Sequence, residues 1–202
     1  NKVDNTIDSA EITNSTSVMM TTVAGNKAAI GYVSLGSLDE SQVKAVLIDG
    51  AEATAENVKS GTYKVSRPFN IATKGEPTGL AKDFINFILS KEGQAVVTDN
   101  KYIAVNDAAE SFVSDGSSGQ IAVGGSSSVS PVMEKLIEAY KSVNPNASID
   151  LQTSDSTSGM TGTMDGTFAI GMASRELKDD EAAQLTGTAI ALDGIAVVVN
   201  PA

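Results

Sequence analysis

The chain has 202 residues, a formal net charge of −11, and no cysteine, histidine or tryptophan. This length suffices for one large domain or two small ones with a hydrophobic core. Without cysteine or histidine, the sequence excludes disulfides, thiolate or imidazole metal sites and Ser-His-Asp triads, and we expect neither a metal nor a cofactor. The acidic charge, the lack of a Lys/Arg cluster and an aromatic content of 4% argue against a nucleic-acid partner.

The first half of the sequence predicts short strands and helices in an irregular order. Residues 17–24 favour a helix that stops at Gly25-Asn26. The best amphipathic pattern lies at about 78–91, where apolar residues recur at helical spacing. The other expected elements are a solvated helix or loop at 1–17, strands at 29–33 and 43–48, a helix opening at Thr54, a bent strand or strand pair at 63–73, a short helix at 95–97 and an apolar stretch at 102–105.

Residues 106–119 are polar, contain a Gly/Ser-rich run and show no strong period, so they are interpreted as a linker. After the linker, strands and helices alternate strictly. The expected strands are 121–123, 148–152, 168–173 and 194–199, and the expected helices are 131–143, 157–165 and 179–185. This alternation is typical of parallel βαβ units, so we expect an α/β fold with a mostly parallel sheet flanked by helices.

Three turns follow strands of this expected sheet, at 124–128, 154–159 and 173–175, and all three carry hydroxyl side chains. In such sheets ligands bind outside the carboxyl ends of the strands. The first turn reads Gly-Gly-Ser-Ser-Ser and precedes Ser130, expected as a helix N-cap, and Pro131. Free backbone N–H groups and the helix dipole there would form a cradle for a small anion. Alternatively, these Ser and Thr residues serve only as helix caps, and the residues alone leave both interpretations open.

Several stretches together resemble a known family. Residues 124–135 (GGSSSVSPVMEK), 153–160 (TSDSTSGM), 170–178 (IGMASRELK) and 192–200 (LDGIAVVVN) resemble the front half of a phosphate-binding protein. That protein is the substrate-binding component of the high-affinity phosphate ABC importer, of the type II periplasmic-binding-protein-like family, in its Gram-positive form. Residues 12–36, with AIGYVSLG, and residues 66–103, with SRPF, resemble the back half. The resemblance covers nearly the whole chain outside the linker.

The order of the two halves differs from that family, because here the back half comes first. The stretch that the family places between them, with a Gly-Ser-Gly-Thr-Arg-like motif that donates to phosphate, is not found in the sequence. A circular permutant with a deletion, a fragment of two tandem copies, or two pieces written as one chain would each explain this order. The linker resembles the end of one copy running into the next, which favours the tandem repeat.

The resemblance implies two α/β lobes with a ligand cleft between them. Residues 61–105 with 120–202 would form the first lobe, complete but permuted, and residues 1–60 would form a partial second lobe, with 106–119 as the linker. A partial sheet leaves unpaired strand edges, so a homo-oligomer or a domain swap is expected.

The resemblance also implies binding without chemistry. The phosphate ligands at the first two turns would be Ser126, Ser127, Ser128, Ser156 and Thr157. At the third turn the family places an acidic residue that accepts the phosphate proton, whereas this chain has Ser174 and Arg175. Arg175 would either pair with the anion as a bidentate fork or form a salt bridge with Glu176 or Asp179.

We therefore expect an extracytoplasmic solute-binding protein that delivers inorganic phosphate to a membrane ABC permease. It would lie outside the cell or at the cell surface, lipid-anchored in its parent protein. One alternative is a phosphate-sensing or adhesin-like module that keeps the fold with weak or no ligand binding. The other is a phosphoester hydrolase, although without His, Cys or a Gly-x-Ser-x-Gly elbow nothing would activate a serine nucleophile.

Overall fold

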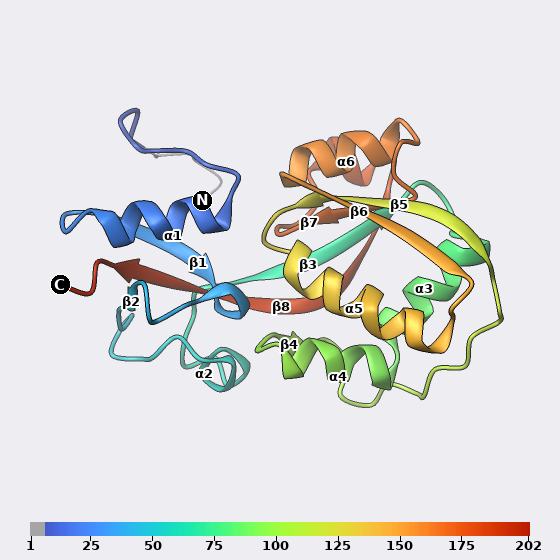
Figure 1. The fold of residues 1–202 in the computed structure, drawn as a ribbon, viewed down its shortest axis with the longest axis horizontal. Helices are drawn as coiled ribbons and strands as arrows, with labels where there is room; N and C mark the ends of the chain where they lie inside the picture. Colours follow the sequence, from blue (N-terminus) through green and yellow to red (C-terminus); the bar gives the residue numbers. More distant parts are fainter. Residues whose placement is uncertain (1–6) are drawn as a thin grey trace.

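A computed structural model describes residues 7–202, and its strands join into one long sheet (Figure 1). The part of the expected second lobe that falls on residues 1–6 lies outside the described residues. The strands follow the order β1 (Ile30–Ser34), β8 (Thr186–Val199), β3 (Ser66–Thr73), β7 (Ile170–Ala173), β5 (Gly119–Ser126) and β6 (Ala147–Ser154). Two short strands, β2 (Lys44–Ala45) and β4 (Ile103–Ala104), also pair with β8.

The larger lobe has helices on both faces of the β3-β7-β5-β6 part of the sheet (Figure 1). On one face lie α3 (Gly79–Leu89), α4 (Lys91–Asp99) and α5 (Ser130–Val143), and on the other lie α6 (Ser156–Met164) and α7 (Asp179–Ala182). The amphipathic patterns account for this arrangement, because the apolar stripes of α3 and α5 are buried on the strands. Residues 67–73 share a sheet with residues 121–123, as expected of two segments of one lobe, although the expected linker separates them in the chain.

The smaller lobe has its own hydrophobic core. It contains α1 (Thr16–Gly25), β1, the 3-10 turn η1 (Leu35–Ser37), β2 and α2 (Ala55–Lys59). The core residues are Val23, Val33, Leu35, Val43, Ala51, Val58, Tyr63, Ile103, Ala196 and Val198. The C-terminal part of β8 thus belongs to this lobe, whereas residues 194–199 were predicted to belong to the first lobe. The reason is that β8 is 14 residues long and pairs with β3 first and with β1 afterwards.

The sheet is mixed, which corrects the expectation of a mostly parallel sheet. Only the β5–β6 and β5–β7 pairs are parallel, and β3 is antiparallel to both β7 and β8. The strands after residue 119 do run in one common direction, as the alternation predicted. However, β3 comes from the first half of the chain and inserts between β7 and β8, so that neighbouring strands there are antiparallel.

Residues 106–118 form no helix or strand, as expected of a linker, but they are fixed to the larger lobe. Asp83 on α3 accepts hydrogen bonds from Ser114 Oγ (2.7 Å), from the Asp115 N–H (3.0 Å) and from Tyr140 Oη (2.6 Å). The Phe112 ring packs edge-on against Phe87, with 5.3 Å between ring centroids. This segment is therefore a packed part of the lobe rather than a free tether.

None of the helices between residues 7 and 202 has the length and apolar character that a membrane span requires.

Candidate functional site

The three hydroxyl-bearing turns lie at one edge of the sheet. In the parallel part, Ser126 at the end of β5 pairs in register with Ser154 at the end of β6, and Gly125 pairs with Met172 of β7. Because the carboxyl ends of parallel strands meet at the same edge, the turns at 124–128, 154–159 and 173–175 are neighbours, as the sequence predicted.

The first turn presents two hydroxyls that have no partner among the described residues, those of Ser127 and Ser128, and both side chains are half-buried. Ser126 has a different role because it is only 3% exposed and its hydroxyl oxygen accepts the Ser128 N–H at 3.3 Å. The Ser127 N–H donates to Ser154 O at 3.0 Å, which joins the first turn to the second. Ser126 therefore shapes the turn, while Ser127 and Ser128 keep free donors.

Ser130 is the first residue of α5 and does not cap it, which corrects the sequence prediction. The N-cap position belongs to Val129, and Pro131 lies in the first turn of the helix as expected. The Ser130 hydroxyl instead donates to Ser126 O at 3.2 Å and lies 2.8 Å from Thr153 Oγ1. The helix start is thereby tied to strands β5 and β6 at the site edge.

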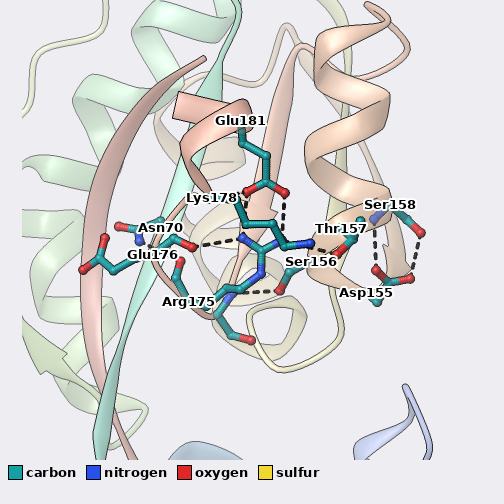
Figure 2. Close-up of polar contacts among 10 residues, drawn as sticks. Asn70, Asp155, Ser156, Thr157, Ser158, Arg175, Glu176, Lys178 and Glu181 are labelled. Carbon is teal, nitrogen blue, oxygen red and sulfur yellow. Dashed lines mark hydrogen bonds and ion pairs between the residues drawn. The ribbon is translucent and has the colours of Figure 1, made fainter. Parts of the chain in front are cut away.

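In the second turn, a residue of the turn itself caps the start of helix α6. Asp155 is the N-cap of α6, and its carboxylate accepts the Ser158 N–H (3.0 Å) and the Ser158 hydroxyl (2.7 Å) (Figure 2). The hydrogen bond from the Ser158 N–H is the main reason that the pKa of Asp155 lies below its usual value. Since this carboxylate occupies the end of the helix, an anion at the edge would meet the hydroxyls of the turn instead.

Two glycines bring α6 close to the strands. Gly125 has φ +136°, and a Cβ added there would lie 2.3 Å from Met172 O. A Cβ on Gly159 of α6 would lie 2.7 Å from the Cα of Gly125. Larger side chains at these positions would push α6 off the sheet and separate the second turn from the first.

Arg175 at the third turn is bound by a partner that the sequence analysis did not propose. Its Nη1 and Nη2 donate to the Glu181 carboxylate at 2.7 and 2.8 Å, and Nη1 also donates to Glu176 O at 3.0 Å (Figure 2). The hydrogen bonds from Arg175 hold the pKa of Glu181 below its usual range. The salt bridge expected with the side chains of Glu176 or Asp179 is replaced by this bidentate pair with Glu181, whose side chain is only 3% exposed.

Hydroxyls also connect the second and third turns. The Ser174 N–H donates to Ser156 Oγ at 3.1 Å. Arg175 Nη2 donates to Thr157 Oγ1 at 3.3 Å (Figure 2). Ser174 Oγ accepts a hydrogen bond from Arg67 Nη1 at 3.3 Å. Each of these hydroxyl oxygens acts as an acceptor, so each keeps its own hydrogen for donation to a ligand.

Arg67, on β3, was not proposed as a site residue, and it brings a buried carboxylate to the same edge. Its Nε donates to Asp193 Oδ2 at 3.1 Å, and Asp193 is completely buried on β8. Burial raises the pKa of Asp193 to about 6, against the opposing effect of the neighbouring Arg67. The Ser-Arg-Pro-Phe and Leu-Asp-Gly motifs contain these two residues, but their spacing along the chain does not indicate that they meet.

A cavity of about 460 Å³ opens between the site edge and the start of α1 in the smaller lobe. It is lined by Asn14, Ser15, Thr16, Ser17, Met20, Ser37, Ser127, Ser130, Pro131, Glu134, Thr153 and Ser154. Ser127 is thus in the cavity, whereas Ser128, Ser156 and Ser174, the expected site residues of the three turns, lie at the edge but do not line it. The sequence did not predict that hydroxyl groups of the smaller lobe would line this cavity.

No group of three or more acidic side chains with the arrangement of a metal site occurs in residues 7–202. At this edge the described residues offer hydroxyl donors and guanidinium groups. This is a set that suits a small oxyanion.

The sequence of the chain matches a family model. The model describes a PBP superfamily domain, and it matches residues 4–92 and 111–202. The chain is also similar to a solved structure, the crystal structure of a phosphate-binding protein of a phosphate ABC transporter from Streptococcus pneumoniae. The TM-score is 0.77 at 50% sequence identity, and the match covers 100% of this chain and 78% of that one.

Two curated relatives agree with this match. The chain is 55% identical over 201 residues to the phosphate-binding protein PstS 2 of Streptococcus agalactiae, which covers 98% of this chain and 68% of that protein. It is 51% identical over 199 residues to PstS 2 of Streptococcus pneumoniae, with the same coverage. The chain therefore belongs to the PBP superfamily, in the same family as these PstS proteins.

Proposed function

We propose that this chain is the solute-binding module for inorganic phosphate of an ABC-type importer. The observation that carries the proposal is the sheet edge where three turns bring together hydroxyls with free hydrogens, two of them, on Ser127 and Ser128, without any partner in the described part of the chain. The relatives named above as phosphate-binding proteins support the choice of anion.

The proposed hydroxyl ligands act by hydrogen bonding. Ser127 and Ser128 donate from the first turn, Ser156 and Thr157 from the second, and Ser174 from the third, while Ser126 holds the first turn in shape. Hydrogen bonds to a charged acceptor are stronger than those between neutral groups, which favours an oxyanion over a neutral solute. Because the net charge of −11 opposes an anion at long range, affinity must come from these short-range donors.

No observation favours the two alternatives. A phosphoester hydrolase needs a base beside its serine, and the sequence has neither histidine nor a thiol. A sensing or adhesin-like module that has lost its ligand would not need to keep free hydroxyls at a shared edge. We therefore propose a binding protein without catalytic activity.

The proposal extends to location and partners. An importer collects its solute outside the membrane, so the chain would work outside the cell and dock on a membrane permease. The edge strand β1 exposes Ile30 and Tyr32, which are 72% and 67% exposed. Such an edge supports pairing with a second copy, so a homo-oligomer or domain swap is part of the proposal.

Isothermal titration with sodium phosphate tests the proposal. We expect saturable binding, and the S127A and S128A variants should each bind about 10- to 100-fold more weakly, as a lost hydrogen bond to a charged group predicts. S118A is the matched control, because Ser118 is an exposed serine away from the edge. Absence of saturable phosphate binding, or release of nitrophenol from nitrophenyl phosphate, would overturn it.

A further inference from the structure

The sequence contains two arginines, Arg67 and Arg175, so a guanidinium that meets an anion must come from one of them. Both terminal nitrogens of Arg175 donate to the Glu181 carboxylate. Glu181 is 2% exposed, and withdrawal of Arg175 toward a ligand would leave a buried carboxylate without its cation. The role of Arg175 is thus to join α7 to the third turn.

Arg67 has a different set of contacts. Nε donates to Asp193 and Nη1 donates to Ser174 Oγ, while Nη2 makes no hydrogen bond with any described residue. The side chain is 19% exposed. One side of the guanidinium is therefore anchored on a buried carboxylate, while Nη2 on the other side has no partner among the described residues and belongs to a side chain that is partly exposed.

The anchor of Arg67 is itself fixed. Asp193 Oδ1 accepts a hydrogen bond from Ser34 Oγ at 2.7 Å, and the Arg67 guanidinium carbon lies 5.5 Å from the centroid of the Phe69 ring. Contacts to β1, β3 and β8 thus set the direction of the guanidinium before any ligand arrives. A donor oriented in advance loses little conformational freedom on binding.

We infer that Arg67, rather than Arg175, is the residue whose guanidinium pairs with the oxyanion at this edge. The inference rests on the proposed function for the identity of the anion, and goes beyond it in naming the cation. Arg67 Nη2 and the hydroxyl hydrogens of Ser174 and Ser156 form one connected set of donors, because Arg67 Nη1 donates to Ser174 Oγ and the Ser174 N–H donates to Ser156 Oγ. Such a set offers an oxyanion one charged N–H donor beside two hydroxyl donors, and hydrogen bonds from a charged donor are the stronger kind.

Nitrogen-15 NMR of the guanidinium Nε–H groups tests the inference, since it reports each arginine separately. Sodium phosphate or sodium sulfate is added to the chain up to high millimolar concentration, and spectra of R67Q and R175Q assign the two signals. We expect phosphate to shift the Arg67 signal and to leave that of Arg175 in place. R67Q should bind phosphate about 10- to 100-fold more weakly, and R67K, which keeps the charge but not the fork, should fall between.

Thermal unfolding shows which variants are folded. If a variant is not folded, the spectra of the unmutated chain still show whether Arg67 contacts the anion. If phosphate binds while the Arg67 signal stays fixed, or if folded R67Q binds within twofold of the unmutated chain, the inference is overturned and the proposed function stands. If sulfate shifts the Arg67 signal as strongly as phosphate does, Arg67 pairs with oxyanions in general, and the proposal that the site selects phosphate is overturned. If neither anion shifts Arg67 or binds, both the inference and the proposed function are wrong.

Discussion

Two buried carboxylates at the site behave differently because their partners differ. Glu181 receives two hydrogen bonds from Arg175 and one from the Lys178 N–H, and these outweigh its burial, so its pKa is lowered. Asp193 shares Arg67 with Ser174 and lies deeper, so burial prevails and its pKa is raised to about 6. The same residue chemistry thus gives a firm structural ion pair in one place and a carboxylate that titrates near neutral pH in the other.

This difference predicts a pH dependence for Asp193. Its pKa is about 6 in the folded chain against 3.8 for an ordinary aspartate, so between these values the folded state binds more protons than the unfolded state. The contribution of Asp193 to the free energy of unfolding therefore falls as pH rises through this window. Urea unfolding should show that stability relative to D193N increases from about pH 7 to about pH 5. S118A, which replaces an exposed serine and removes no ionisable group, should lack this trend. A stability difference between D193N and the unmutated chain that stays constant with pH would contradict the pKa.

At the scale of elements, the segment 106–118 shows how an irregular stretch is held on a helix. Asp83 on α3 is 2% exposed, and it accepts three hydrogen bonds from residues far along the chain. Burial alone would raise the pKa of Asp83, but hydrogen bonds from Tyr140, Asp115 and Ser114 lower it overall. The carboxylate thus joins the segment to both α3 and α5.

Replacement of Asp83 by alanine should release the segment. The Tyr140 hydroxyl and the Asp115 N–H would lose their acceptor, so we expect a loss of about 2–4 kcal/mol in the free energy of unfolding. Hydrogen exchange should show faster exchange of the Asp115 amide while amides in β5 stay protected. S118A, at an exposed position of the same segment, is the control. An unchanged Asp115 exchange rate in folded D83A would mean that the segment is held by its apolar contacts alone.

At the scale of the whole molecule, β8 connects the two lobes. Its first part lies in the larger lobe beside β3, and its last residues pair with β1 and β2 in the smaller lobe (Figure 1). Asp193 and Gly194 lie where the partner strand changes. A Cβ on Gly194 would meet Leu35 Cδ1 at 2.4 Å, so the absence of a side chain lets the smaller core close over the strand. The proposed site is therefore formed at the junction of the lobes.

This architecture predicts weak phosphate binding by the 202-residue chain. The chain matches 68% of PstS 2 from Streptococcus pneumoniae. Its sequence lacks the Gly-Ser-Gly-Thr-Arg-like segment that the family resemblance assigns to the opposite wall of the ligand cleft. Loss of two or three charge-assisted donors, at about 1.5–3 kcal/mol each, should weaken binding by about two to four powers of ten. Calorimetry on the chain and on PstS 2 from Streptococcus pneumoniae measures this difference in affinity, with light scattering to check that each protein is monomeric. Sub-micromolar affinity of the monomeric chain would show that the segment is dispensable.

Much of the larger lobe follows from local sequence patterns. Alternation of apolar strands and amphipathic helices predicted β5, β6 and β7 and placed their hydroxyl-bearing ends at one edge, because parallel strands joined by helices have few alternative topologies. The helix pattern at 78–91 likewise predicted α3, because its apolar residues form one face of a helix and that face must be buried. Local periodicity and turn chemistry carry this information, and the motifs in the turns carried the family resemblance.

Local sequence patterns do not predict which residues face one another at the site, because these contacts form only in the folded chain. Arg67 and Asp193 are 126 positions apart, and they meet because β3 inserts between β7 and β8. Arg175 pairs with Glu181 instead of its nearer acidic neighbours because α7 turns that carboxylate inward. Such contacts depend on strand order and on the packing of helices from distant parts of the chain. Because neither follows from local periodicity, the choice between the two arginines required the three-dimensional structure.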